Sequence, residues 1–279
     1  MRRTSAIGSK NYSSLETKNV KSPRLFFLAF IYLLNACASV TYTQPELPYS
    51  EIAIAQSEIT NTKFLQLEKK NTAEIQAIFN TVIDSLKFPA QEFCEVYSEQ
   101  SSCSWNFKLE DSEVFNAYAS GTNDITILSG LINGIDASEE LAFVVAHELG
   151  HHIANHIAES SRNIILGELA GALVGLAVYG SEGKSSDINQ IADLGGSIGR
   201  LTFSRAQENE ADLIGIAILI KAGLDLNKAQ MVIIRMAQED TRKKRSGFLD
   251  THPSSPERLA YFNLNKAKIL NGELFPFMD

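Results

Sequence analysis

Apolar residues recur at helical spacing in several parts of this chain. Residues 75–86 carry them at intervals of three and four, which predicts an amphipathic helix that ends at Pro89. Residues 141–146 and 213–220 are apolar throughout. Segments of this kind are typical of helices that are buried on most sides. The chain is therefore expected to form a helical core.

Signals for helix ends and for strands complete the pattern. Asp136 and Glu139 form a capping pattern ahead of residues 141–146, and Ser255-Pro256 is expected to begin a last helix. The expected fold class is α+β, mainly helical, with a small antiparallel sheet beside the helices. The segments with strand-like composition are 93–97, 104–109, 113–119 and 124–128.

Residues 164–180 form a glycine-containing apolar segment. Glycines recur there at four-residue spacing, which allows close approach of helices, in membranes especially. Seventeen residues that include Glu168 make a poor membrane span. A helix packed against the glycines of 195–199 is therefore favoured over membrane insertion, and residues 182–187 are expected to form a loop over the cleft.

The first 36 residues have the features of a bacterial lipoprotein signal peptide. Basic residues precede ten apolar residues, 25–34, which are too few to span a bilayer comfortably. Leu34-Asn35-Ala36-Cys37 resembles the lipobox, whose cysteine is lipidated and becomes the mature N-terminus. The resemblance implies a lipid anchor in the envelope of a diderm bacterium, with the periplasmic face of the outer membrane favoured. An uncleaved anchor with an incidental cysteine is the alternative.

The rest of the chain is expected to hold a short tether, 37–50, and a single domain, 51–279. Within that domain, Cys94 and Cys103 either close a disulfide-bonded loop or remain two free thiols.

The net charge of the chain limits the kinds of partner that it is expected to bind. The chain has a formal net charge of −8, and residues 1–36 carry six basic and one acidic residue, so the mature chain has about −13. It has no basic patch. Nucleic acid is therefore not expected as a partner.

Four of the five histidines lie within residues 147–156, which contain the pattern H-E-x-x-H. Residues four apart return to nearly the same helix face, so His147 and His151 can bind one metal ion. Glu148 lies at the flank, where it can act on a metal-bound water. The two other histidines, expected to support the ligands or to pack beside them, are His152 and His156.

A catalytic zinc ion takes three protein ligands, and the third is expected in residues 204–212. Glu208 and Asp212 lie four apart, on one face of a predicted helix. One carboxylate can bind the metal, and the other can accept a hydrogen bond from a ligand histidine. Glu210, between them, is expected to face solvent.

The two segments together, 147–151 and 204–212, resemble a known two-part signature. It is that of the zinc metallopeptidase family of the CAAX prenyl endopeptidase, the heat-shock peptidase HtpX and the periplasmic β-barrel assembly-enhancing protease. The supporting segments, which extend the resemblance over most of the mature chain, are 116–119, 125–127 and 250–258.

The resemblance implies a gluzincin-like fold and one zinc ion per chain, with His147, His151 and Glu208 as ligands. It gives Asp212 the supporting role and Glu148 the role of general base. It also implies an endopeptidase that acts on misfolded or unassembled envelope proteins.

Two other functions compete with this interpretation. A non-catalytic, chaperone-like lipoprotein that keeps the fold is the main alternative, but a pure binder has no need of Glu148. A hydrolase of peptidoglycan peptides fits the location, although no wall-binding segment supports it.

Several roles stay open at the level of the sequence. The donor that stabilises the oxyanion is Arg205, His252 or a tyrosine. His252 is otherwise a fourth zinc ligand that holds the enzyme inactive, or an ordinary loop histidine. Extended protein substrates are expected to add as a strand beside Ile125-Thr126-Ile127.

Overall fold

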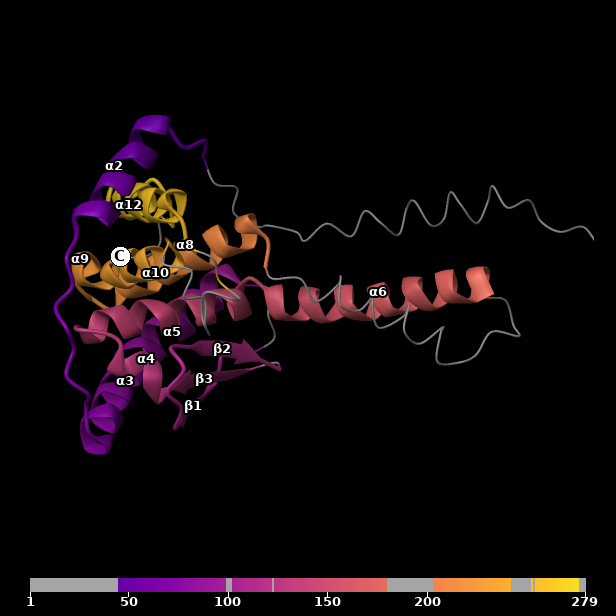
Figure 1. The fold of residues 1–279 in the computed structure, drawn as a ribbon, viewed down its shortest axis with the longest axis horizontal. Coiled ribbons are helices and arrows are strands. Elements are labelled where there is room, and N and C mark those ends of the chain that lie inside the picture. Colours follow the sequence, from indigo (N-terminus) through magenta and orange to yellow (C-terminus); the bar gives the residue numbers. More distant parts are fainter. Residues whose placement is uncertain are drawn as a thin grey trace, which may run out of the picture. The chain divides into compact units, whose positions relative to one another are not determined.

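The computed structural model describes residues 45–98, 102–121, 123–179, 203–241, 252 and 254–275. Within this part of the chain most residues are helical, and one small sheet packs beside the helices (Figure 1). The predicted α+β, mainly helical class is therefore confirmed. The helices are α2 (Tyr49–Asn61), α3 (Thr72–Tyr97), α4 (Ser129–Asn133), α5 (Ser138–Ile153), α6 (His156–Tyr179), α8 (Arg205–Lys221), α9 (Leu226–Ala229), α10 (Met231–Thr241) and α12 (Pro256–Leu270). The strands are β1 (Asn106–Glu110), β2 (Ala117–Ser120) and β3 (Asp124–Leu128).

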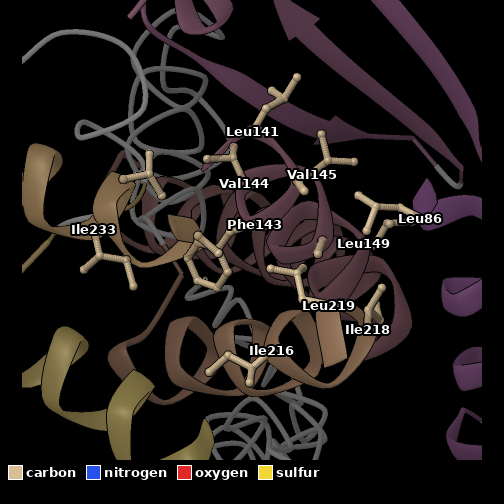
Figure 2. Close-up of a cluster of buried hydrophobic side chains, with 14 of the residues drawn as sticks. Leu86, Leu141, Phe143, Val144, Val145, Leu149, Ile216, Ile218, Leu219 and Ile233 are labelled. Atoms are coloured by element: carbon tan, nitrogen blue, oxygen red, sulfur yellow. The ribbon is translucent and has the colours of Figure 1, made fainter. Parts of the chain in front are cut away.

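Helices α5 and α8 form the centre of the hydrophobic core. Every residue of α5 from Glu140 to Ile153 is buried, and so are residues 210–219 of α8. Figure 2 shows side chains of both helices in one cluster, together with Leu86 of α3 and Ile233 of α10. Each buried leucine or isoleucine in such a cluster contributes about 1.5–3 kcal/mol relative to an exposed one. The helices predicted from the two apolar segments are thus confirmed as buried.

Two glycines allow α5 and α8 to approach closely. A β-carbon at Gly150 would lie 2.6 Å from the carbonyl oxygen of Ala211, which is too close for any side chain. A β-carbon at Gly215 would lie 3.2 Å from the backbone nitrogen of His147. The glycine inside the H-E-x-x-H segment therefore brings the second helix against the first.

The sheet has the strand order β1-β3-β2. β2 pairs antiparallel to β3, whereas β1 pairs parallel to it. The prediction of an antiparallel sheet is therefore wrong for one pairing. A tight turn at Gly121, where φ is 58°, reverses the chain between β2 and β3. Residues 111–116 instead carry the chain from one edge of the sheet to the other, so β1 and β3 run in the same direction.

Helix α3 is longer than predicted. It continues through Pro89 to Tyr97, so the helix end at Pro89 and the strand at 93–97 are both wrong. Leu86, Ala90 and Phe93 are all buried, at helical spacing. Packing of this continuous apolar face outweighs the hydrogen bond that the proline removes. The residue after Phe93 in α3, Cys94, forms a disulfide bond with Cys103, which precedes β1.

Helix α5 begins differently from the prediction, and α12 begins as predicted. The side chain that closes the α5 cap is Glu140, not Glu139, because its Oε1 accepts hydrogen bonds from the backbone nitrogens of Asp136 and Ala137 at 2.9 and 3.2 Å. At α12, Ser255 is the N-cap before Pro256.

The predicted tether and apolar segment are partly described. Helix α2 begins at Tyr49, inside the range predicted as the tether, and residues 45–48 ahead of it are not helical. Helix α6 contains most of residues 164–180, and several of its apolar side chains are exposed, Ile165 at 63% among them. None of the helices in the described ranges is long and apolar enough to cross a membrane. The predictions that lie outside these ranges concern 1–36, Cys37, the loop 182–187 and the glycines of 195–199.

Candidate metal centre

Three side chains from α5 and α8 converge where the two helices meet. The Nε2 atoms of His147 and His151, one turn apart on α5, are 3.0 Å apart. Glu208, in the first turn of α8, places Oε2 3.5 Å from Nε2 of His147 and Oε1 3.3 Å from Nε2 of His151. The structure thus brings together the three residues predicted as metal ligands.

His252 completes this group from the segment before α12. Its Nδ1 atom lies 3.1 Å from Nε2 of His147 and 2.9 Å from Oε1 of Glu208. The four residues are all buried, and one potential ligand atom from each lies within 4.8 Å of the others. The side chain of His252 points into this buried cluster, so the interpretation of His252 as an ordinary loop histidine does not fit the structure.

These spacings fit a metal ion. Zinc binds nitrogen and oxygen at ~2.0–2.1 Å in a tetrahedron, which places neighbouring ligand atoms roughly 3.3 Å apart. Oε2 of Glu208 is buried and has no hydrogen-bond partner among the described residues, so a cation would satisfy it. Burial lowers the pKa of His151 well below its usual value, which favours the neutral imidazole that metal binding requires.

Asp212 supports His147 from the side opposite the cluster. Its Oδ1 lies 2.7 Å from Nδ1 of His147. Arg258 of α12 donates to the same carboxylate from Nε at 2.6 Å and from Nη2 at 2.8 Å. Burial acts to raise the pKa of Asp212, but Arg258 and His147 hold that pKa below its usual value. The ionised carboxylate therefore keeps the proton of His147 on Nδ1 and leaves its Nε2 lone pair facing the cluster.

Arg258 is the residue of this site that sequence reasoning missed as a functional group. It is 3% exposed and lies in the first turn of α12. An arginine there is unfavourable for the helix dipole, so its position two residues after Pro256 is a signal that could have singled it out.

Glu148 faces the cluster next to strand β2. Its Oε2 accepts a hydrogen bond from the backbone nitrogen of Ala119 at 2.8 Å. Its Oε1 lies 3.4 Å from Nε2 of His252 and has no hydrogen-bond partner within the described part of the chain. Burial raises the pKa of Glu148, which makes its carboxylate a stronger base. This placement is compatible with the predicted role of general base.

The two remaining histidines have different surroundings. His156 places Nδ1 3.0 Å from Nδ1 of His151 and Nε2 3.2 Å from Oε2 of Glu210. Glu210 is completely buried, so the expectation that it faces solvent is wrong. His152 instead lies with Nε2 3.2 Å from the backbone carbonyl oxygen of Asp124. His156 therefore supports a predicted ligand, whereas His152 connects α5 to the sheet.

Arg205 does not join the cluster. As the first residue of α8 it lies beyond the buried part of that helix, and its side chain is exposed. Its positive charge acts on Glu257, whose pKa is lowered by a hydrogen bond from Ser255 and further by Arg205. The arginine at the site is Arg258 instead.

The predicted substrate strand is not an edge strand. Ile125, Thr126 and Ile127 lie in β3, which is paired on one side with β1 and on the other with β2. Their backbone groups are therefore used within the sheet. The strand that contacts the candidate general base is β2, through Ala119.

The sequence profile of peptidase family M48 matches residues 69–264, which include all the residues of this site. The chain belongs to peptidase family M48. This confirms the metallopeptidase family that the two-part signature indicated. Membership in this metallopeptidase family supports the interpretation of the buried histidines and Glu208 as a metal site.

Individual relatives agree with this membership. The chain is 31% identical over 219 residues to a putative beta-barrel assembly-enhancing protease of Vibrio cholerae, an alignment that covers 75% of this chain and 44% of that protein. It is 30% identical over 161 residues to the mitochondrial metalloendopeptidase OMA1 of Arabidopsis thaliana, covering 58% and 31%. For the human metalloendopeptidase OMA1 the identity is 24% over 170 residues, covering 58% and 32%. This M48 peptidase thus spans less than half the length of each of these relatives.

Proposed function

We propose that this chain is a zinc-dependent endopeptidase. The observation that carries the proposal is the convergence of His147, His151 and Glu208 beside the carboxylate of Glu148. When bound by these three residues, zinc supplies Lewis-acid chemistry that polarises a peptide carbonyl and acidifies a water molecule. The M48 membership and the names of the relatives as metalloendopeptidases support the same reaction class.

The chain's own residues perform the proton transfer. Oε2 of Glu148 is fixed by the N–H of Ala119, so Oε1 is the oxygen that takes a proton from the attacking water. The raised pKa of Glu148 favours uptake of this proton, and the protonated carboxyl group is then in place to pass it to the leaving amine. Asp212 and Arg258 keep His147 in the tautomer that leaves Nε2 free for the metal.

His252 is proposed as a fourth ligand that must withdraw before a substrate binds. Its Nδ1 lies among the ligand atoms, and its Nε2 points towards Oε1 of Glu148, so it occupies the space beside both groups. Three candidates were predicted for the donor that stabilises the oxyanion. Arg205 lies outside the cluster and His252 is given a different role, so a tyrosine is the remaining candidate. An H252A variant with higher peptidase activity and unchanged zinc content would support this role, whereas unchanged activity would contradict it.

Extended segments of misfolded or unassembled proteins are the proposed substrates. Ala119 directs its N–H away from β3 and towards Glu148, and Ala117, two residues earlier, directs its backbone groups to the same side. A peptide that adds along this edge of β2 lies next to the general base. Main-chain pairing of this kind gives affinity without a strict sequence preference, which suits protein quality control.

The proposed location is the periplasmic face of the outer membrane, through a lipid at Cys37. The lipobox-like sequence supports the anchor, and the relative's name as a beta-barrel assembly-enhancing protease supports an envelope role. Replacing Cys37 by alanine is expected to abolish the incorporation of labelled fatty acid into the protein. Unchanged incorporation of the label would contradict the anchor.

One comparison tests the catalytic proposal. The parent protein and E148Q are assayed for casein cleavage, for peptidoglycan cleavage and for bound zinc. We expect E148Q to keep stoichiometric zinc and to lose casein cleavage by at least about 100-fold, because only the general base is changed. Equal behaviour of the two proteins would favour the chaperone-like alternative, and cleavage of peptidoglycan alone would replace the substrate class.

A further inference from the structure

The two ligand histidines on α5 are supported in different ways. His147 contacts a carboxylate directly, through Asp212. His151 contacts another imidazole, with its Nδ1 atom 3.0 Å from Nδ1 of His156, and this second ring has Nε2 3.2 Å from Oε2 of Glu210. His151, His156 and Glu210 are all completely buried.

His151, His156 and Glu210 form a row of three side chains. The chemistry of the imidazole ring fixes where the protons lie in this row. A neutral imidazole carries one proton, and Nε2 of His151 must be free of it to bind a metal, so the proton lies on Nδ1. Nδ1 of His151 therefore donates to Nδ1 of His156. The proton of His156 is then on Nε2, where it donates to the carboxylate of Glu210. One arrangement of protons thus satisfies both contacts and the metal-binding state together.

The backbone places His156 in this position. In a continuous helix, a residue five places after His151 would lie ~140° around the axis and could not face it. The helix is interrupted instead: α5 ends at Ile153, and Asn155 has a φ of 64°. Asparagine is one of the few residues that tolerate this left-handed conformation. The interruption turns α6 so that its first side chain, His156, faces back towards His151.

We propose that His156 and Glu210 are positioning residues that hold His151 in its metal-binding tautomer and orientation. The inference rests on the proposed zinc site and extends it to residues outside the two-part signature. Support of a ligand histidine by such a partner is worth about 10- to 100-fold in metal affinity. The same row joins the start of α6 to α8, so the position of the interruption after α5 affects metal affinity.

The test compares variants of the full chain. H156L removes the acceptor, H156N keeps an oxygen near the place of Nδ1, and E210L removes only the far end of the row. H152L is the matched control, because His152 is a neighbouring buried histidine that contacts the backbone of Asp124 instead. Zinc affinity is measured by chelator competition, ligand geometry by the visible spectrum of the Co²⁺-loaded protein, and folding by circular dichroism of the metal-free protein.

We expect H156L to bind zinc about 10- to 100-fold more weakly and to change the Co²⁺ spectrum, with H156N recovering most of the affinity. E210L is expected to lose about 3- to 10-fold, and it tests the inference even if H156L does not fold. H152L should stay within about 3-fold of the parent.

Parent-like zinc affinity and Co²⁺ spectra in folded H156L or E210L would overturn the inference, while stoichiometric zinc in the parent would leave the proposed function standing. A parent protein that binds no zinc would overturn both.

Discussion

Oδ1 of Asp212 lies 2.7 Å from Nδ1 of His147, and the same carboxylate accepts two hydrogen bonds from Arg258. All three side chains are buried, with exposures of 0–3%. Two opposite charges in the protein interior are stable only as a pair, since each alone keeps its full cost of desolvation. The orientation of His147, a candidate metal ligand, therefore depends on a charge pair contributed by two other helices.

Replacing Asp212 by alanine is expected to destabilise the metal-free protein by about 3–5 kcal/mol, because the buried Arg258 loses its hydrogen-bonded partner and keeps only the longer contact of 3.7 Å with Glu208. The measurement is urea unfolding followed by circular dichroism. The double variant D212A/R258M serves as control and should be more stable than D212A alone, since it removes the unpaired charge. The single variant R258M completes the comparison. If the losses of unfolding free energy in D212A and R258M add up to the loss in the double variant, the two side chains are not coupled.

Gly150→Ala is expected to destabilise the fold by about 1–3 kcal/mol and to weaken metal binding, because the new methyl group would push α8 away from α5. Gly215→Ala is the matched control on the facing helix. Its β-carbon would meet nothing closer than 3.2 Å, so a smaller loss is expected. Chemical unfolding and zinc titration of both variants measure the difference, and equal losses would argue against the close contact at Gly150.

Reduction of the disulfide between Cys94 and Cys103 is expected to lower the free energy of unfolding by about 2.5–3 kcal/mol, from the closure entropy of a loop with a sequence separation of 9. Guanidinium unfolding with and without a reductant measures this value. A C94A/C103A variant provides the control, because the reductant should have no further effect on it. A parent protein that is insensitive to reductant would contradict the prediction.

Metal removal is expected to lower the melting temperature. Free zinc at 1,000 times its dissociation constant would stabilise the folded state by about 4 kcal/mol, because the ligands come together only in that state. Melting curves in excess zinc and in chelator give the comparison. H147A should show no such difference, and an equally large zinc effect in that variant would place the ion elsewhere.

Features that depend on local spacing could be predicted from the sequence. The i, i+4 relation of His147 and His151 holds in any helix, and the helix itself follows from its apolar residues. The cap at Ser255 and the strand at 124–128 are also local, and both were predicted at the right residues.

Features that depend on the packing of distant segments could not be predicted. The continuation of α3 through Pro89 is decided by the buried face that includes Ala90 and Phe93. Glu210 looks like a surface residue by composition, but the return of His156 after the left-handed Asn155 brings a buried imidazole against it. The central place of β3 likewise depends on a crossing connection that no local pattern reveals.

The ligand residues lie far apart in sequence, with two imidazoles on α5, the carboxylate on α8 and the last ring just ahead of α12. An unfolded chain can therefore bring together, within one short segment, only the two imidazoles of α5. The three candidate ligands from α5 and α8 therefore come together only after these two helices have packed against each other. The docking of α8, which carries Glu208, against α5 is thus the folding step that completes the group of three candidate ligands.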